Sequence, residues 1–312
     1  MRTTARSSPA FLLVTVLLIG CSTTPKTPDT ITDIKDRAAE HAEFGNRYFQ
    51  QANYPQALRF FELALDANTS VDHLSGIART HNSIGNVYLA VGEVDAAEAS
   101  FTRAYRIAVA LEEPNLLLQS ASNLGQVALR RDDTGLAMEF FSRALGYRTP
   151  DGDPTDVAVI LHNIATVHIR RGETDSAERL LREAISINTE ERKWPELASN
   201  HYMLASLYSR QGRFPEARIE ALRALELDKQ VENSAGIAAD LKALGLISRR
   251  MGELETAVDY LSRALQVTAT IGHVEEAASI LDHLASVAIE LGRPEDAARY
   301  RGQRAALTGD GE

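Results

Sequence analysis

The chain holds one cysteine and one tryptophan among 312 residues, and aromatic side chains make up only 6% of it. A lone cysteine cannot form a disulfide within the chain, so disulfides are excluded as a source of stability. No segment shows the strand-like alternation of polar and apolar residues, and neither a His-Glu-x-x-His motif nor a glycine-rich phosphate loop is present. We therefore expect a helical protein with no catalytic site, no metal and no cofactor.

Long apolar runs are also scarce, and the one that stands out lies near the start of the chain. Arg2 and Arg6 precede a nine-residue stretch that is apolar except for Thr15, and the small residue Gly20 follows it. Nine residues are too few to cross a bilayer, which takes about 20. A basic start, a short apolar core and a small residue at the cleavage point are typical of a secretory signal peptide, so we predict that residues 1–20 are removed.

The tetrapeptide Leu18-Ile19-Gly20-Cys21 resembles the lipobox of bacterial lipoproteins. The resemblance implies that Cys21 is diacylated on its sulfur and becomes the new N-terminus, and two or three acyl chains anchor a protein stably. The alternative is a chance cysteine after an ordinary signal peptide. Residues 21–34 are then the lipidated cysteine and a flexible tether. Ser22, in place of aspartate, favours the outer membrane over the inner one, with the protein facing the periplasm.

Positive charge is in deficit along the chain. Lys and Arg number 33 against 43 Asp and Glu, a net charge of −10. Removing residues 1–20 takes away Arg2 and Arg6, which leaves 31 against 43, or −12. An acidic surface argues against nucleic acid as a partner and against peripheral contact with anionic lipid. We expect the protein to meet the membrane through its lipid anchor only.

What the sequence does have is a repeat of 40 residues, kept seven times without an insertion. A small residue marks each unit, at Gly45, Gly85, Gly125, Ala165, Ala205, Gly245 and Ala285. Alanine follows twelve residues later every time, at Ala57, Ala97, Ala137, Ala177, Ala217, Ala257 and Ala297. This period predicts an array of stacked units, and such arrays bind other macromolecules far more often than they catalyse reactions.

Each unit contains two amphipathic stretches with helical spacing. In the second unit, Ile77, Ile84 and Val87 lie on one face of the first stretch, and Gly92 ends it. The small columns let the two helices of a unit approach closely, and a large residue such as Phe101 fills the space beside them. No unit can bury its apolar face alone, so we expect the units to stack.

An apolar–small pair recurs in every unit, at Phe44-Gly45, Ile84-Gly85, Leu124-Gly125, Ile164-Ala165, Leu204-Ala205, Leu244-Gly245 and Leu284-Ala285. In three units a tyrosine follows the small residue three positions later, at Tyr48, Tyr88 and Tyr208. With the alanine column, this set resembles the tetratricopeptide repeat. The resemblance implies an all-α, right-handed α-solenoid of seven helix pairs over residues 35–307, with 308–312 as a disordered tail. It also implies a non-enzymatic scaffold for a protein or peptide partner.

Two features depart from the family pattern. The family's period is about 34 residues, so each unit here is longer. The proline that closes the family's unit is shifted to Pro114, Pro154 and Pro195, where proline favours the start of the next unit's first helix.

In this fold the first helix of each unit lines the concave surface, which makes its polar columns the candidate partner-binding residues. Four consecutive units place arginine at the end of that helix, at Arg130, Arg170, Arg210 and Arg250. Guanidinium groups suit an acidic peptide, a terminal carboxylate or an anionic glycan. The alternative is a structural role, because arginine is favoured at a helix C-terminus and Glu173 or Glu253 stands nearby to neutralise it.

Asparagines form a second candidate set on the same helices, at Asn46, Asn82, Asn86, Asn123 and Asn163. Side-chain amides in a groove can bond a peptide backbone without sequence preference, and plain solvated polarity is the alternative. Three histidines, His41, His81 and His201, also share a column. We interpret them as rings packed between helices rather than as a metal-binding or pH-sensing set.

These features predict a protein-interaction adaptor tethered to the bacterial envelope by a lipidated cysteine, with an acidic protein segment as its expected partner. A ligand-responsive regulatory module and a glycan-binding envelope protein are the alternatives. The adaptor predicts an extended polar groove, the regulatory module an enclosed pocket, and the glycan binder exposed aromatic side chains in the groove.

Overall fold

The computed structural model describes residues 30–309. Within that range the chain forms fourteen α-helices and no strand. The predicted signal peptide, Cys21 and most of the predicted tether lie outside the described residues. None of the described helices is both long and apolar enough to span a membrane.

Each repeat unit contributes one pair of helices. The first helices are α1 (Ile31–Gln50), α3 (Leu74–Val91), α5 (Pro114–Arg130), α7 (Pro154–Arg171), α9 (Trp194–Arg210), α11 (Ser234–Arg250) and α13 (Val274–Glu290). The second helices are α2 (Tyr54–Ser70), α4 (Val94–Leu111), α6 (Thr134–Gly146), α8 (Thr174–Glu190), α10 (Phe214–Gln230), α12 (Leu254–Ile271) and α14 (Pro294–Thr308).

The turns between helices depend on residues with left-handed backbone. Five of the seven first helices are followed by the predicted glycine, at Gly92, Gly172, Gly212, Gly252 and Gly292, with φ between 68° and 86°. Glycine accepts this conformation without a Cβ penalty. Ala52 and Asp132 take the same place in the other two units, and Glu232 does so after α10, with φ of 55°, 60° and 56°. A side chain in this region costs about 1 kcal/mol.

The two ends of the solenoid differ slightly from the predicted boundaries. Thr30 and Asp33 form a capping box, in which Asp33 N donates to Thr30 Oγ1 at 3.1 Å and Thr30 N donates to Asp33 Oδ2 at 2.8 Å. This cap satisfies the first free N–H groups of α1. The helix therefore begins at Ile31, four residues before the predicted boundary at 35, and α14 runs one residue past 307 to Thr308.

Inside each unit the two helices touch across the small column. A Cβ atom on Gly125 of α5 would stand 2.5 Å from Cε1 of Phe141 on α6, well inside van der Waals contact. The first two units repeat this glycine–phenylalanine contact. In the fourth unit the equivalent positions hold Ala165 and Leu181, both fully buried. In the sixth unit a glycine faces leucine, since a Cβ on Gly245 would lie 2.7 Å from Cγ of Leu261.

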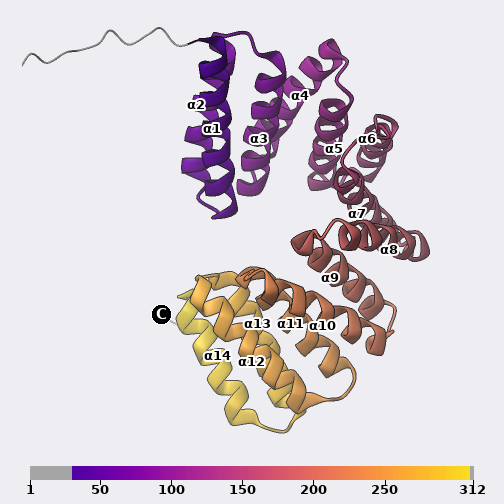
Figure 1. The fold of residues 1–312 in the computed structure, drawn as a ribbon. Coiled ribbons are helices and arrows are strands. Elements are labelled where there is room, and N and C mark those ends of the chain that lie inside the picture. Colours follow the sequence, from indigo (N-terminus) through magenta and orange to yellow (C-terminus); the bar gives the residue numbers. More distant parts are fainter. Residues whose placement is uncertain (1–29, 310–312) are drawn as a thin grey trace, which may run out of the picture.

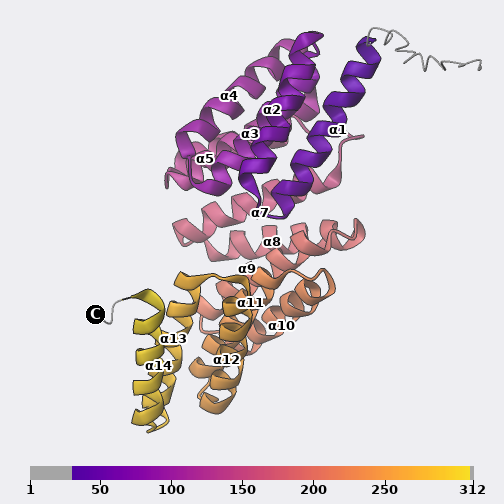
Figure 2. The same cartoon turned by 90° about the vertical axis from the view of Figure 1, so that its left-hand side faces the viewer.

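Neighbouring units stack unevenly, and this gives the molecule its shape. Each odd-numbered helix contacts the next odd one, whereas no even-numbered helix contacts another even one within the described chain. The odd helices therefore form the inner layer of a curved stack and the even helices the outer layer. Figure 1 shows the arc, with its two described ends on the same side, and Figure 2 looks into it. The predicted all-α solenoid of seven helix pairs is confirmed.

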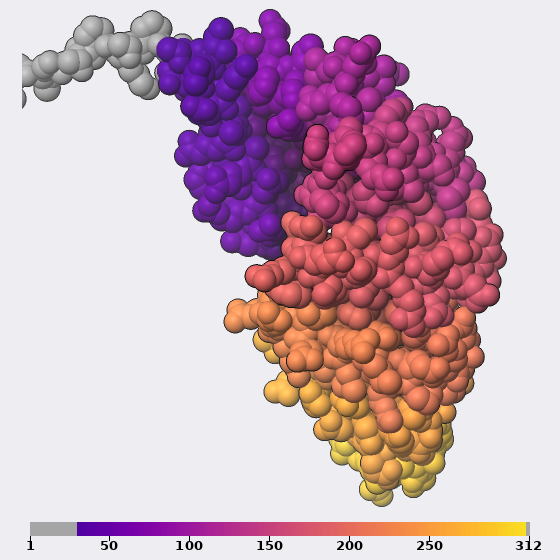
Figure 3. Space-filling model, turned by 45° about the vertical axis from the view of Figure 1, so that its right-hand side comes forward, coloured from indigo at the N-terminus to yellow at the C-terminus, as the bar shows by residue number. Residues whose placement is uncertain are grey.

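The units follow one another in chain order along the molecule. In Figure 3 the colours pass in successive bands from one end to the other. One unit is irregular. α6 has 13 residues, whereas the other even-numbered helices have 15 to 18. Pro150 follows shortly after its end and cannot continue a helix, so α6 offers less length than its counterparts for packing on α7.

Candidate partner-binding groove

The odd-numbered helices together form the concave face, which carries two hollows. The N-terminal hollow lies across α3, α5 and α7, and the C-terminal hollow lies across α9, α11 and α13 with an edge from α12. Both are built from the same repeat columns: Asn82 lines the first, while Tyr202 and Lys242 of the same column line the second. The concave face is therefore one continuous surface whose chemistry changes from unit to unit.

The N-terminal hollow has a volume of about 410 Å³, and five of its eleven lining residues carry amides, namely Asn82, Asn86, Gln119, Asn123 and Gln126. Asn86 is exposed and Gln126 is half-buried, and neither side chain hydrogen-bonds within the described part of the chain. Each amide offers two N–H donors and one carbonyl acceptor. These two groups are therefore free to bind a ligand.

Other amides of this hollow are held in place by the protein itself. Asn82 is buried, its Nδ2 donates to Ser120 Oγ at 3.1 Å, and the Ser120 hydroxyl donates back to its Oδ1 at 3.2 Å. Asn123 Nδ2 also donates to Asn82 Oδ1, at 3.4 Å. The network crosses the contact between α3 and α5. Asn82 therefore links these two helices beneath the hollow, and Asn123 links Asn82 to the more exposed part of the lining.

The remaining two predicted asparagines do not line this hollow. Asn46 is exposed on α1, outside both hollows. Asn163 lies half-buried on α7, and its Nδ2 is buried without an acceptor among the described residues. The structure thus brings Asn82, Asn86 and Asn123 together and leaves Asn46 and Asn163 apart.

The four predicted arginines lie in the last turns of α5, α7, α9 and α11, along one rim of the concave face. Arg170 folds back onto the preceding unit, where its Nη1 donates to the carbonyl oxygen of Leu129 at 2.6 Å and to Asp132 Oδ1 at 2.8 Å. The Leu129 carbonyl, which also accepts a bond from Asp132 N at 3.1 Å, thus ties the end of α5 to α7. Arg170 therefore has a structural role that the repeat column did not reveal.

The other three arginines of the rim are available. Arg130, Arg210 and Arg250 are exposed and make no ion pair within the described residues. The glutamates expected to neutralise the rim bind elsewhere: Glu173 contacts His168 at 2.5 Å and Glu253 contacts Arg218 at 2.9 Å. The rim therefore carries unpaired positive charge in an otherwise acidic protein.

The arginines next to the rim link neighbouring units. Arg131 binds both Asp95 and Glu98, at 2.6 and 2.8 Å, and Arg249 binds Glu290. All of these partners lie in an adjacent unit. Exposed ion pairs of this kind contribute little each, about 0 to 1 kcal/mol, so their main effect is to orient the units rather than to hold them together.

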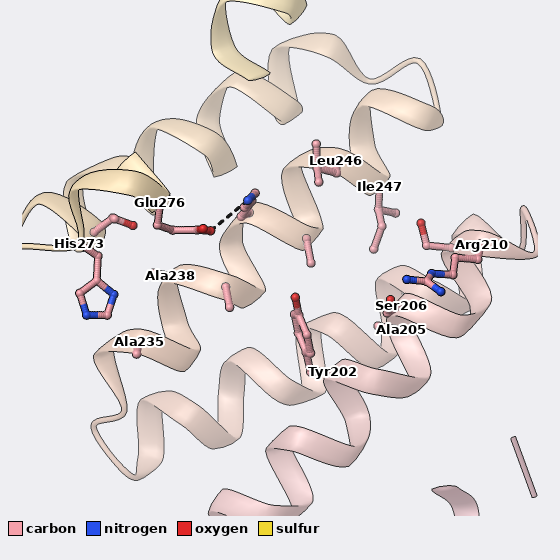
Figure 4. A pocket seen from close by; sticks show the side chains of 15 residues that line it. Tyr202, Ala205, Ser206, Arg210, Ala235, Ala238, Leu246, Ile247, His273 and Glu276 are labelled. Carbon is pink, nitrogen blue, oxygen red and sulfur yellow. Dashed lines mark hydrogen bonds and ion pairs between the residues drawn. The ribbon is translucent and has the colours of Figure 1, made fainter. Parts of the chain in front are cut away.

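The C-terminal hollow is larger, about 580 Å³, and differs in chemistry. Small residues of α11, among them Ala235, Ala238, Ala239 and Ala243, form much of its lining. Figure 4 shows Tyr202 projecting from α9 between Arg210 on one side and Glu276 on the other. Lys242 Nζ donates to Glu276 Oε1 and to Ser279 Oγ, both at 3.0 Å. Burial, with the charges of Asp240 and Glu276, raises the pKa of Tyr202, so its hydroxyl stays protonated and able to donate.

Sequence reasoning missed Tyr202, Lys242 and Glu276 as lining residues. The signal was available for the first two, because they continue the column of Asn82 at 40-residue spacing. The residue in that column changes along the chain from asparagine through histidine to tyrosine and lysine. A pattern based on one repeated residue type therefore does not reveal this surface.

Of the three histidines that share a column, only His201 is buried. His201 Nδ1 lies 2.7 Å from Glu220 Oε2, and both side chains are almost fully buried. The described residues contain no group of three or more His, Cys, Asp or Glu side chains arranged to hold a metal ion.

Comparison with known proteins agrees with this architecture. The tetratricopeptide repeat family model matches residues 76–149 and 156–230. These two stretches are therefore tetratricopeptide repeats. No curated protein matches the chain.

Several solved structures share the fold. A Rap protein in complex with Competence and Sporulation Factor is 15% identical with a TM-score of 0.66, and the match covers 88% of this chain and 75% of that one. The Rap conjugation regulator of plasmid pLS20, in complex with the Phr* peptide, is 17% identical with a TM-score of 0.66, covering 93% and 82%. The type IV pilus biogenesis factor PilW is 19% identical with a TM-score of 0.55, covering 78% and 98%. At these identities the likeness shows the fold alone.

Proposed function

We propose that this protein is a non-enzymatic scaffold that holds a segment of a partner protein along its concave face. The observation that carries the proposal is the N-terminal hollow, where Asn86 and Gln126 present unbonded amides on neighbouring units of one continuous surface. An extended peptide has alternating N–H and C=O groups, and amide side chains can pair with both. The Rap conjugation regulator of plasmid pLS20, which shares the fold and is in complex with the Phr* peptide, supports this use of the fold.

The rim favours an acidic partner. Arg130, Arg210 and Arg250 supply positive charge beside the groove, and charged residues at a rim mainly accelerate association and discriminate between partners. Arg170 is not part of this set, because it binds Leu129 and Asp132.

We further propose that a lipid on Cys21 holds the scaffold at the bacterial envelope, facing the periplasm and preferentially at the outer membrane. The lipobox-like tetrapeptide that ends in Cys21 supports this. The partner would then be kept near the membrane while the tether lets the solenoid turn.

The groove is tested by crosslinking and pull-down from cells that produce the full chain. We compare the wild type with Asn86→Ala/Gln126→Ala, after circular dichroism shows that both are folded. The matched control is Gln56→Ala/Gln266→Ala on the outer helices α2 and α12, where Gln56 is half-buried like Gln126 and Gln266 is exposed like Asn86. We expect the groove variant to lose a partner that the control retains. Equal recovery with both variants would reject the groove as the binding surface.

The rim is tested in the same assay with Arg130→Glu/Arg210→Glu/Arg250→Glu, leaving Arg170 intact so that the unit contact is kept. An acidic partner should be lost, and its wild-type recovery should fall as salt rises. Undiminished recovery would mean that the rim does not recognise the partner.

The anchor is tested with Cys21→Ser. We expect the wild type to take up a radiolabelled palmitate and to enter the detergent phase on Triton X-114 partitioning, and the variant to do neither. A variant that still behaves as a lipoprotein would exclude Cys21 as the attachment site.

A second candidate function, a ligand-responsive regulatory module, is favoured by the size of the C-terminal hollow, although this hollow opens onto the concave face and is not the enclosed pocket that the module predicts. Its volume of about 580 Å³ lies within the range of about 300 to 1,000 Å³ typical of small-molecule sites. Tyr202, Arg210 and Glu276 would orient a polar ligand there. A small molecule that raises the melting temperature of the wild type but not of Tyr202→Ala would support this candidate over the scaffold.

A further inference from the structure

Two carboxyl side chains are buried in the contact between the fifth and sixth units. Asp228, near the end of α10, is 6% exposed, and Asp240 of α11 is 1% exposed. Asn233 Nδ2 donates to Asp228 Oδ1 at 2.9 Å, but neither oxygen of Asp240 has a hydrogen-bond donor among the described residues. The contact is tight, since a Cβ atom on Gly236 would lie 1.9 Å from Asp228 Oδ2.

No other contact between units has this chemistry. The equivalent positions, 40 residues apart, hold Asn68 with Thr80, Ala108 with Ser120, Arg148 with Ile160, Asn188 with Asn200, and Thr268 with Ile280. In the first of these, Asn68 Nδ2 donates to Thr80 Oγ1 at 3.4 Å. At the other contacts the buried side chains in these positions are uncharged. The contact between α10 and α11 therefore differs from them in burying two acids that face each other.

The surroundings do not neutralise the pair. Besides Asp228 from α10, the helices packed against α11 bring Tyr202 from α9 and Glu276 from α13, and Glu276 is already paired with Lys242 of α11. No cation of the described residues, on α12 or elsewhere, lowers the pKa of either carboxyl. Two like charges in such a site cannot both be stable.

A shared proton resolves the conflict. Burial, and then the charge of Asp228, raises the pKa of Asp240 to about 8, and burial also raises the pKa of Asp228. At neutral pH the closed contact therefore holds one proton that an exposed aspartate, with a pKa of 3.8, would have released.

We propose that the contact between α10 and α11 is a pH-sensitive hinge of the solenoid, closed while the Asp228–Asp240 pair holds a proton and opened more readily as that proton is lost. Opening exposes Asp240 to water, where its carboxyl ionises freely. Between pH 4 and pH 8 the closed state keeps the proton and the open state does not, so the open fraction rises about tenfold for each pH unit.

The hinge lies beside the groove. α9 belongs to the fifth unit and α11 to the sixth, and both line the C-terminal hollow. Separating them breaks the hollow apart. Opening of the hinge therefore changes the shape of the C-terminal half of the concave face. A ligand bound across α9 and α11 is then released as pH rises. This inference goes beyond the proposed function and does not depend on the identity of a partner.

Hydrogen exchange of the full chain, followed by mass spectrometry from pH 5 to pH 7.5, tests the hinge without a ligand. When closing is faster than exchange, the chemical exchange rate alone rises about tenfold per pH unit. We expect peptides from the α10–α11 contact to exchange about a hundredfold faster per pH unit, because the open fraction rises as well. Peptides from the α8–α9 contact, where Asn188 and Asn200 hold the equivalent positions, should show only the tenfold rise.

The variant Asp240→Asn keeps the shape of the side chain and removes the proton. Its α10–α11 peptides should return to the tenfold rise, while peptides from the α8–α9 contact keep their tenfold rise. A tenfold rise at both contacts of the wild type would overturn the proposal, and this comparison within one molecule holds even if the variant does not fold. A hundredfold rise that persists in Asp240→Asn would overturn it too, since another group would then be titrating.

Discussion

A single methyl group placed on Gly125 tests how tightly the two helices of a unit are packed. The new Cβ of Gly125→Ala would lie 2.5, 2.7 and 2.9 Å from three ring atoms of Phe141. The Phe141 ring is fully buried, so the whole ring must shift to make room. Two opposing effects decide the result. Alanine gains about 1 kcal/mol over glycine as a helix former, and overpacking a tight core costs about 1 to 3 kcal/mol.

With three ring atoms inside 3 Å, we expect the steric effect to win and Gly125→Ala to lose up to about 2 kcal/mol of stability. The matched control is Gly302→Ala on α14, where a Cβ meets nothing within 4 Å and φ is not positive. That variant feels only the helix preference and should gain about 1 kcal/mol if α14 does not fray. Urea denaturation followed by circular dichroism compares the two.

The double variant Gly125→Ala/Phe141→Leu reproduces the alanine–leucine pair of the fourth unit. Its loss should be smaller than the sum of the two single losses, with a coupling of about 1 kcal/mol or more. If Gly125→Ala stabilises the protein as much as Gly302→Ala does, the close approach is not a constraint, and the pairing of glycine with phenylalanine has another cause.

Three further outcomes are expected. Because burial raises the pKa of Asp240, the wild-type protein loses stability as pH rises from 4 to 8. Asp240→Asn removes this loss, so its stability relative to the wild type should rise over the same range and reach about 4 kcal/mol at pH 7. Urea titrations at pH 4.5 and 7 check this, and an equal gain at both would contradict it. Arg170→Ala should cost about 1 kcal/mol and Arg130→Ala nearly nothing in thermal melts; equal effects would deny Arg170 its structural role. Glu232→Gly should gain about 1 kcal/mol by relieving a left-handed side chain; a loss would show that Glu232 makes a contact that offsets this strain.

The architecture was predictable because it depends on short-range spacing. The small column, the alanine column and glycines such as Gly92 repeat at 40 residues, and each specifies a local event: a close approach, a buried contact or a helix end. Pro114 and Pro154 begin α5 and α7, as their positions predicted. The two columns agree in every unit and the glycine in five of seven, so little besides the helix boundaries was left open.

The groove was less predictable, because its residues act across units. Arg170 and Arg210 look equivalent in the sequence, yet only Arg170 reaches back to the end of α5, 41 residues earlier, at Leu129. Asp240 resembles any surface acid until the stacking of α10 on α11 buries it against Asp228. Contacts of this kind depend on how one unit sits on the next, which a column of residue types does not encode.

The shortness of α6 has a consequence for how the array comes apart. In a linear stack, stability is close to a sum of unit terms and nearest-neighbour terms, so cooperativity breaks first at the weakest neighbour contact. α6 has 13 residues to offer to α7. An apolar cluster of α5, α6 and α7 joins the third unit to the fourth, and a separate continuous cluster joins the fourth unit to the seventh. Pulled or denatured, the molecule should therefore part between its third and fourth units, and the four C-terminal units should outlast the three N-terminal ones as a separate folding block.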